Sequence, residues 1–318
     1  MTRPSVLITR RWPASAVAHL RVRYDVTMDE ADSPLTKKAL TDAMGKFDAL
    51  CPAVSDRIDG SIIAAPNPRV RVIGNFGVGV DHIDLEAARN AGIVVTNTPG
   101  VLTEATAELA ITLILMTTRR AGEGERQLRA GKWVGWHPTH LMGQGLSGKV
   151  LGLVGFGRIA QATARIAREA FGMRIAYHSR KAVPGADAEY YEDLDRLVAA
   201  ADIVSLHCPG GKETFHLLDG RRLSLMKRAA VLINTARGTV VDEAALAESL
   251  RSGSIAAAGL DVYEREPIVH PALLDLENVV LLPHLGSATI ETRTAMAMLV
   301  AKNLDAFFDG QPLPNRVA

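Results

Sequence analysis

The chain has 318 residues, of which 47% are apolar and 22% are charged. At roughly 100–200 residues per domain, this length predicts two domains with sizeable cores. The 36 basic and 35 acidic residues leave a net charge of +1, which argues against nucleic-acid or anionic-membrane binding, because both need concentrated positive charge. The apolar runs fall short of the roughly 20 residues of a membrane-spanning helix. The two distant cysteines, Cys51 and Cys208, form no disulfide or zinc pattern and favour a reducing cytoplasm.

Short apolar runs alternate with longer helical patterns from residue 1 to about residue 98, and the alternation resumes from residue 149 to residue 282. Such alternation predicts the α/β class, with parallel sheets covered by helices on both faces. The second segment holds six strand-like runs, which fit a doubly wound sheet. These runs cover residues 150–153, 174–177, 203–206, 231–233, 256–260 and 279–282.

The stretch between these two segments holds an apolar helical pattern and then a region rich in glycine and tryptophan. Residues 105–118 are apolar nearly all round, which predicts a helix buried in a domain core or a subunit contact. Residues 120–146 contain six glycines together with Trp133 and Trp136. This irregular region is either a surface loop pinned by its aromatic side chains or an arm that packs on a second subunit. Residues 288–308 predict a final long helix.

A glycine-rich turn follows the strand-like run at residues 150–153. Gly155, Gly157 and Ala160 complete the pattern G-x-G-x-x-A, and a helical pattern comes next. In this context the pattern predicts a dinucleotide-binding turn rather than a plain strand-to-helix turn. Gly155 permits the tight turn, Gly157 allows the backbone to approach a pyrophosphate, and Ala160 lets the helix pack closely on the strand. The anion is expected at the helix N-terminus.

The next strand-like run bears on the choice between NADH and NADPH. An NAD site usually places Asp or Glu about 20 residues beyond the glycines, where it bonds the ribose 2′-hydroxyl. This chain instead has His178, Ser179 and Arg180. A hydroxyl and a guanidinium can bind a 2′-phosphate, so NADPH is the expected cofactor and NADH the weaker alternative. The competing interpretation is a solvated basic loop.

Three polar segments follow later strand-like runs, and they contain Arg237, Glu266 and His284. In a doubly wound sheet the ligand crevice lies outside the carboxyl ends of the strands, so these side chains can converge there. Taken singly, each is more typical of a loop residue with local bonds. Together, and after a dinucleotide turn, they favour a catalytic site.

Over nearly its full length the chain resembles the D-2-hydroxyacid dehydrogenases, and within them the glyoxylate/hydroxypyruvate reductases. The matching segments are 78–82, 97–109, the glycine turn and the Arg, Glu and His segments. The resemblance implies two Rossmann-like domains with a cleft between them. Residues 1–98 plus 288–318 would form a flavodoxin-like substrate domain, which is discontinuous. Residues 99–287 would form the doubly wound nucleotide-binding domain.

The resemblance also implies roles for individual residues. Arg237 would grip the substrate carboxylate and the keto oxygen, and Glu266 would hold His284, the general acid. Histidine suits proton transfer near neutral pH, and a carboxylate on its other ring nitrogen favours the protonated ring. The backbone amides of Val78 and Gly79 would complete the carboxylate pocket. The implied cofactor contacts are Thr106, Gly155, Gly157, Arg158, Ile159, Ser179, Arg180, His207, Pro209, Asp261 and Gly286; no metal is expected.

Substrate size is where the resemblance leaves alternatives open. Ala53 and Val54 would line the substrate side chain, and both are small enough to admit more than glyoxylate. Trp136, beside Trp133, would reach into the active site of a homodimer partner and narrow the pocket toward small 2-keto acids. The alternatives are a reductase of bulkier acids such as phenylpyruvates, and a cofactor-sensing corepressor. The length disfavours long phosphoglycerate dehydrogenases, and the Glu-His pair disfavours formate dehydrogenases.

Overall fold

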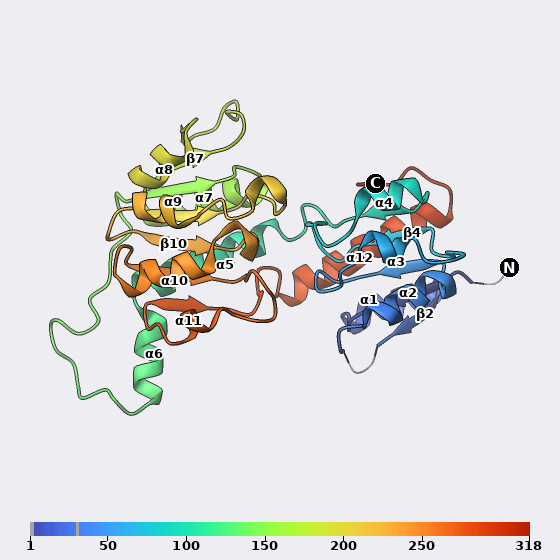
Figure 1. Ribbon diagram of the computed structural model, residues 1–318, viewed down its shortest axis with the longest axis horizontal. Helices are drawn as coiled ribbons and strands as arrows, with labels where there is room; N and C mark the ends of the chain where they lie inside the picture. Colours follow the sequence, from blue (N-terminus) through green and yellow to red (C-terminus); the bar gives the residue numbers. More distant parts are fainter. Residues whose placement is uncertain (1–2, 30–31) are drawn as a thin grey trace. The chain divides into compact units, whose positions relative to one another are not determined.

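The computed structural model describes residues 3–29 and 32–318, and the chain divides into two compact units. Unit 1 comprises Met1–Leu102 and Ser287–Ala318, and unit 2 comprises Thr103–Gly286. Each unit is built on one parallel β-sheet with helices on both faces (Figure 1). The predicted α/β class with two parallel sheets is therefore confirmed. Within the described part of the chain, every helix is too short or too polar to cross a bilayer.

Unit 1 has a five-stranded sheet in the order β2-β1-β3-β4-β5, which is the flavodoxin-like order. Helices α1 and α12 cover one face, and α2, α3 and α4 cover the other. The strands are β1 (Ser5–Ile8), β2 (Asp25–Met28), β3 (Ala49–Cys51), β4 (Val72–Gly74) and β5 (Val94–Thr96). The helices are α1 (Ala14–Arg23), α2 (Lys37–Lys46), α3 (Gly60–Ile63), α4 (Leu85–Asn90) and α12 (Ile290–Phe308).

Unit 2 has a seven-stranded sheet in the order β12-β11-β10-β9-β6-β7-β8. Counted from β6, this is the doubly wound dinucleotide-binding order with one strand added at the β12 edge. Its switch point lies between β6 and β9, where the glycine turn leaves β6. The strands are β6 (Val150–Val154), β7 (Arg174–His178), β8 (Glu189–Tyr190), β9 (Ile203–Leu206), β10 (Val231–Asn234), β11 (Ala257–Leu260) and β12 (Val279–Leu281).

The apolar helix α5 (Thr103–Thr118) lies in the core of unit 2, as its all-round apolar surface predicts. It packs beside α7 (Arg158–Phe171) on one face of the sheet. The opposite face is covered by α8 (Leu194–Ala200), α9 (Gly220–Leu225), α10 (Glu243–Arg251) and α11 (Pro271–Leu274).

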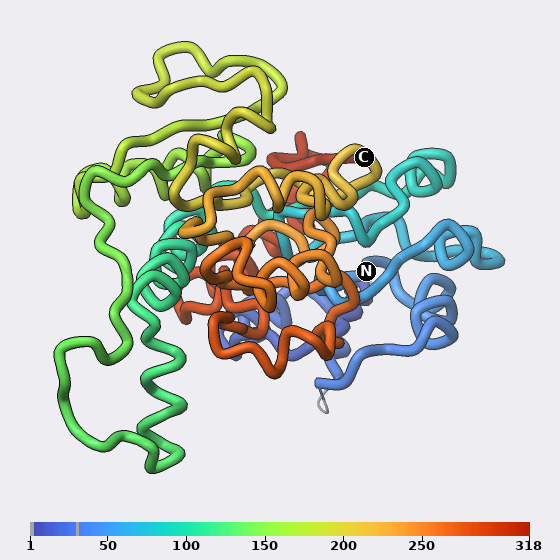
Figure 2. Tube along the Cα trace, turned by 60° about the vertical axis from the view of Figure 1, so that its left-hand side comes forward, coloured from blue at the N-terminus to red at the C-terminus, as the bar shows by residue number. Residues whose placement is uncertain are grey.

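The region after α5 differs from the irregular loop that its glycines predict. Its first part forms helix α6 (Ala121–Arg129), although it contains two helix-weakening glycines. Exposed ion pairs join Arg120 to Glu123 and Arg126 to Glu277. The rest loops out beside α6 before the chain returns to β6 (Figure 2). Trp133 and Trp136 are 52% and 82% exposed. Trp136 is too exposed to pin this region, whereas Trp133 lies against Gln127 and Leu128 of α6, so the surface loop and the subunit-binding arm both stay predictions.

Candidate functional site

Three candidate catalytic side chains follow neighbouring strands of unit 2. Arg237 follows β10, Glu266 follows β11 and His284 follows β12, and these strands are adjacent in the sheet. His284 Nδ1 lies 2.8 Å from Glu266 Oε2, and the two side chains are 34% and 35% exposed. The guanidinium of Arg237 is close enough to act on the charge of Glu266. The structure thus brings all three to one edge of the sheet.

Electrostatics keep the Glu266 carboxylate charged. Partial burial by itself raises the pKa of Glu266, but the hydrogen bond from His284 and the charges of His284 and Arg237 outweigh it. The net effect is a lowered pKa, because the neighbouring positive charges favour the anion. The Tyr263 N–H donates to the other carboxylate oxygen at 3.1 Å. Glu266 is therefore an anion held by two hydrogen bonds, one from the Tyr263 N–H and one from His284 Nδ1.

His284 itself is held in a strained backbone conformation. Its φ is +55°, in the left-handed region that costs a non-glycine residue on the order of 1–3 kcal/mol. Its N–H donates to the Asp261 carbonyl at 2.9 Å, and the following N–H groups of Leu285 and Gly286 donate to the Asp261 carboxylate at 2.7 and 2.9 Å. Asp261 is almost fully buried, so burial raises its pKa against the effect of these donors. Asp261 thereby fixes the turn that carries His284.

The glycine turn has the geometry that a pyrophosphate requires. Gly155 has a φ of +88°, and a Cβ there would lie 2.8–2.9 Å from the backbone of His207 and Cys208. Gly157 is the N-cap of the 14-residue helix α7, and a Cβ on Gly157 would meet nothing within 4 Å. The unpaired N–H groups of a helix N-terminus are a natural anion site. Arg158 and Ile159 are the first residues of this helix, so the turn fits a dinucleotide.

The other predicted cofactor residues are distributed around this edge of unit 2. Thr106 Oγ1 donates to the Gly286 carbonyl at 3.1 Å. His207 follows β9 with its ring beside Ser205 Oγ at 2.9 Å, and burial lowers the pKa of His207 to about 4, so its ring is neutral. The Pro209 carbonyl accepts a bond from Thr214 at 2.7 Å. Ser179 and Arg180 directly follow β7. Burial raises the pKa of the Cys208 thiol to about 11, which fits a packing role.

The predicted substrate residues of unit 1 gather after two neighbouring strands. Ala53 and Val54 follow β3, and Val78 and Gly79 follow β4. A Cβ built on Gly77 would lie 3.0 Å from the Val54 side chain, so the two loops pack on each other. Trp136 belongs to unit 2 and lies in the exposed arm.

A residue absent from the sequence-based prediction organises the Val78–Gly79 turn. Asn75 is fully buried, and its amide nitrogen donates to the carbonyls of Gly77 and Gly79 at 3.0 and 2.9 Å. Its amide oxygen lies 2.9 Å from His82 Nε2. An asparagine just before a glycine-rich turn, where its amide can bond nearby carbonyls, is the signal that could have identified it.

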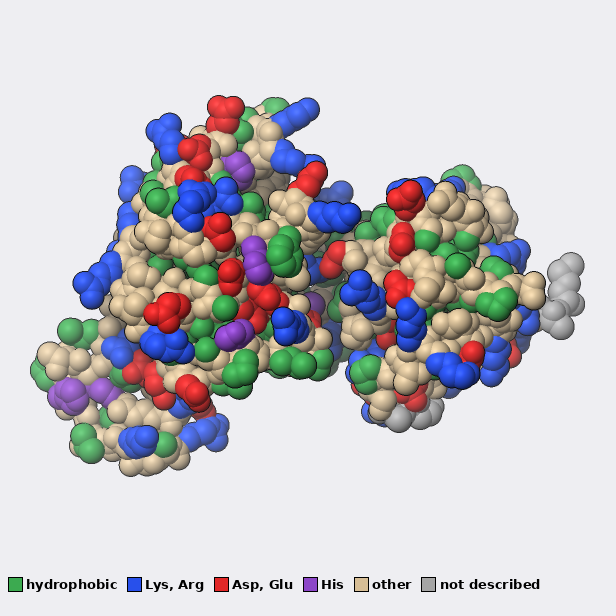
Figure 3. All heavy atoms as spheres, viewed as in Figure 1, with side chains coloured by type: hydrophobic (Ala, Val, Ile, Leu, Met, Phe, Trp, Pro, Cys, Tyr) green, Lys and Arg blue, Asp and Glu red, His purple; other side chains and the backbone are tan. Residues whose placement is uncertain are grey.

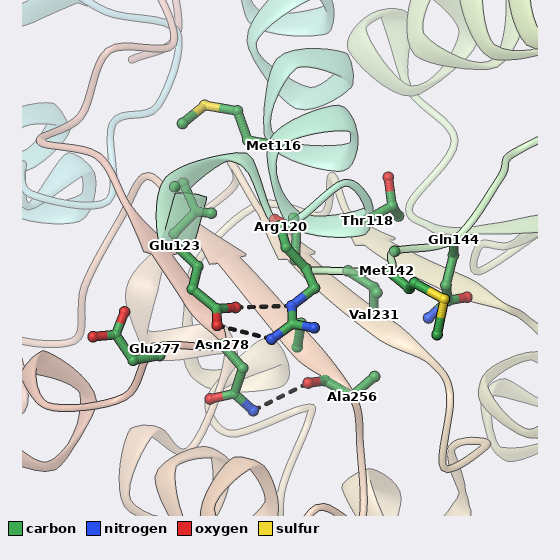
Figure 4. Close-up of a pocket in the computed structure, with 15 residues that line it drawn as sticks. Met116, Thr118, Arg120, Glu123, Met142, Gln144, Val231, Ala256, Glu277 and Asn278 are labelled. Atoms are coloured by element: carbon green, nitrogen blue, oxygen red, sulfur yellow. Dashed lines mark hydrogen bonds and ion pairs between the residues drawn. The ribbon is translucent and has the colours of Figure 1, made fainter. Parts of the chain in front are cut away.

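A cavity of about 400 Å³ lies elsewhere in unit 2 (Figure 4). It is lined by residues at the amino ends of the strands, including Val231 and Ala256, and by Met142 and Gln144 of the arm. An Arg120–Glu123 ion pair at 2.8 Å stands at its wall. Since ligands of such sheets bind at the carboxyl ends of the strands, this cavity is separate from the candidate catalytic site.

Comparison with known proteins identifies the family. Residues 111–286 match the model described as D-isomer specific 2-hydroxyacid dehydrogenase, NAD binding domain. A glyoxylate reductase of Thermococcus litoralis is 46% identical and covers 99% of this chain and 97% of its own. The solved NADPH-dependent glyoxylate/hydroxypyruvate reductase of Sinorhizobium meliloti, in complex with NADP and malonate, is 38% identical. It aligns with a TM-score of 0.90 and covers 100% of this chain and 97% of its own. The TT0316 protein of Thermus thermophilus is 46% identical, with a TM-score of 0.92 and coverage of 99% and 100%. The chain therefore belongs to the D-2-hydroxyacid dehydrogenases and is an enzyme of that family.

Proposed function

We propose that this enzyme reduces small 2-keto acids, glyoxylate and hydroxypyruvate, to the corresponding 2-hydroxy acids with NADPH. The observation that carries the proposal is the pairing of His284 with the charged Glu266, on strand ends next to that of Arg237. Its substrate class is supported by the relatives of 46% and 38% identity, which are named glyoxylate reductase and glyoxylate/hydroxypyruvate reductase.

Each of the three side chains has a distinct part in this reaction. A reduced nicotinamide dinucleotide held by the Gly155–Gly157 turn would supply the hydride for the carbonyl carbon. His284 delivers a proton to the carbonyl oxygen from Nε2, the ring nitrogen that does not face Glu266, and Glu266 stabilises the charged ring beforehand. Arg237 binds the planar carboxylate and offsets the negative charge that develops on the oxygen. The amides of Val78 and Gly79 would bind the carboxylate as well, on a turn shaped by Asn75.

A steady-state comparison of four substrates with both cofactors tests the proposal. Glyoxylate and hydroxypyruvate should have higher kcat/KM values than pyruvate and phenylpyruvate, and NADPH should be preferred over NADH. A preference for phenylpyruvate would instead support the bulkier-acid alternative, which the small Ala53 and Val54 side chains favour. Cofactor binding without turnover of any of the four acids would support a cofactor sensor.

Cofactor preference is expected to depend on Arg180. This side chain is exposed directly after β7, where a 2′-phosphate would meet its charge and the Ser179 hydroxyl. An Arg180→Ala variant should lose roughly tenfold or more in kcat/KM with NADPH, the value of one charge-assisted hydrogen bond. Its kcat/KM with NADH should stay near that of the wild type. An unchanged NADPH-to-NADH ratio would contradict the phosphate contact.

We also propose that the arm joins two copies of the chain and that Trp136 narrows the partner's substrate pocket. Support comes from the exposure of Trp133, Val134 and Trp136, since large apolar side chains gathered on a surface typically mark an interface. A Trp136→Ala variant should gain about tenfold for phenylpyruvate relative to glyoxylate, because a wider pocket no longer excludes the larger acid. Substrate kinetics measure this ratio, and light scattering measures the mass. A monomeric wild type would contradict the proposal.

A further inference from the structure

The turns that carry Arg237 and Glu266 are in direct backbone contact. Gly238 is buried immediately after Arg237, and a Cβ built on it would overlap the backbone of Tyr263 and Glu264. Only glycine permits such an approach without displacing one of the turns. The distance between the guanidinium of Arg237 and the carboxylate of Glu266 therefore depends on where the Tyr263–Glu264 backbone lies.

Two glutamates hold this backbone in place by a reciprocal pair of hydrogen bonds. The Glu264 N–H donates to Glu243 Oε1 at 2.8 Å, and the Glu243 N–H donates to Glu264 Oε1 at 3.1 Å. Glu243 is the first residue of α10 and is only 4% exposed. A buried carboxylate is costly unless it is hydrogen-bonded, so each glutamate is stabilised by the other's backbone. This exchange connects the turn after β11 to the start of α10.

His216 completes the same cluster from a third segment. Its Nε2 lies 2.7 Å from Glu264 Oε1, and its Nδ1 lies 3.9 Å from Asp242 Oδ2. Figure 3 shows histidine and acidic side chains side by side on the displayed face of unit 2. The ring therefore lies between two carboxylates. At 2.7 Å, Nε2 can donate a hydrogen bond to Glu264 Oε1, the same oxygen that accepts a bond from the Glu243 N–H.

From Glu264 the connection continues to the catalytic pair. Tyr263, the preceding residue, donates its N–H to Glu266 and its hydroxyl to the Leu282 carbonyl at 2.8 Å. Leu282 lies two residues before His284. A shift of the Tyr263–Glu264 backbone would thus displace the carboxylate and the imidazole together.

We propose that Glu264, held by Glu243 and His216, is a positioning residue for the reduction. It does not touch the substrate; it fixes the turn on which Glu266 supports His284 and against which the Arg237 turn packs. This inference rests on the proposed function of those three side chains.

The test compares Glu264→Ala with Glu264→Gln in the full-length protein. The glutamine oxygen can accept the same bonds from His216 and Glu243, whereas alanine cannot. Glu264→Ala should lower kcat for glyoxylate about 10- to 100-fold, the cost of misplacing a catalytic group by up to about 1 Å. Its KM for NADPH should stay within about threefold of wild type. Glu264→Gln should keep kcat within about threefold of wild type, because both accepted bonds remain.

Glu248→Ala, which alters a side chain 71% exposed on α10, is the matched control and should behave as wild type.

A second readout does not depend on turnover. Without substrate, the ring ¹⁵N NMR signals of His284 should move in Glu264→Ala and keep their wild-type positions in Glu264→Gln. If Glu264→Ala does not fold, His216→Ala removes one of the two donors from a partly exposed site and should move the same signals. If the wild type fails to reduce glyoxylate while the His284 signals still move in Glu264→Ala, the proposed substrate is overturned and the positioning role stands.

Three results would overturn the positioning role. The first is wild-type kcat and NMR signals in Glu264→Ala, and the second is equal damage from alanine and glutamine. The third concerns metal binding, because ligand atoms of His216, Asp242 and Glu264 lie within 4.8 Å of one another. A rise in Tm with Zn²⁺ that disappears in His216→Ala would make the cluster a metal site instead.

Discussion

Replacement of His284 by glutamine is expected to lower kcat for keto-acid reduction by roughly 10²–10⁴-fold, the range for loss of a general acid. Glutamine can still bond to Glu266, but it cannot deliver a proton to the carbonyl oxygen. The KM for NADPH should change little. The loss should be present at neutral pH, where Glu266 is charged because its pKa is lowered from its ordinary value of 4.5.

The matched control for this variant is His19→Gln, which changes an exposed histidine on α1 and should leave turnover unaltered. Glu266→Gln should cost less than His284→Gln, because it removes the stabilising charge but keeps the proton donor. The double variant should be no slower than His284→Gln alone, since residues that act as a unit are non-additive. Full additivity of the two losses, or near-normal turnover in His284→Gln, would rule out the acid role.

Replacement of Arg237 by lysine is expected to reduce kcat/KM for glyoxylate by roughly 10²–10³-fold, comparable with loss of an oxyanion donor. Lysine keeps the positive charge but carries a compact ammonium group instead of a planar guanidinium. It therefore cannot bind the carboxylate through two parallel hydrogen bonds. Because the same group also faces the developing oxyanion, kcat should fall and KM should rise. Initial-rate measurements over a wide glyoxylate range separate the two effects.

Arg251→Lys is the matched control for this substitution. Arg251 is 54% exposed at the end of α10, where it pairs with Glu248, and its replacement should change neither constant. If Arg237→Lys retained wild-type kcat and KM, another group would have to bind the carboxylate. The Val78–Gly79 turn would then be the remaining candidate.

Much of the fold follows from hydrophobic patterning, and the exceptions have local causes. The strands β9 and β10 are fully buried and mostly apolar, which makes them recognisable in a parallel sheet. The edge strand β8 has only two residues, and neither is buried, so no pattern marks it. Helix α6 is polar and contains two glycines, so helix propensity does not predict it. Helix propensity also takes no account of its ion pairs, Arg120–Glu123 and Arg126–Glu277.

The candidate site was predictable to the extent that it depends on strand ends. Because the carboxyl ends of adjacent parallel strands share one edge, an Arg, a Glu and a His after successive strands were expected to be neighbours. The supporting cluster of Glu243, Glu264 and His216 was not, because its bonds join backbone groups to side chains from three remote segments. The left-handed backbone of His284 likewise depends on the surrounding Asp261 bonds, since few residues other than glycine adopt it.

The division of the chain into two units assigns different properties to different stretches of sequence. The candidate catalytic side chains of Arg237, Glu266 and His284 and the glycine turn belong to the continuous stretch Thr103–Gly286. Ala53, Val54 and the Val78–Gly79 turn belong to Met1–Leu102. Under the proposed roles, recombination with a related gene at residue 102 would exchange the predicted lining of the substrate side chain and retain the proposed catalytic side chains together with Trp136. Under the same proposal, such hybrids would differ in substrate range while His284 and Glu266 stay unchanged.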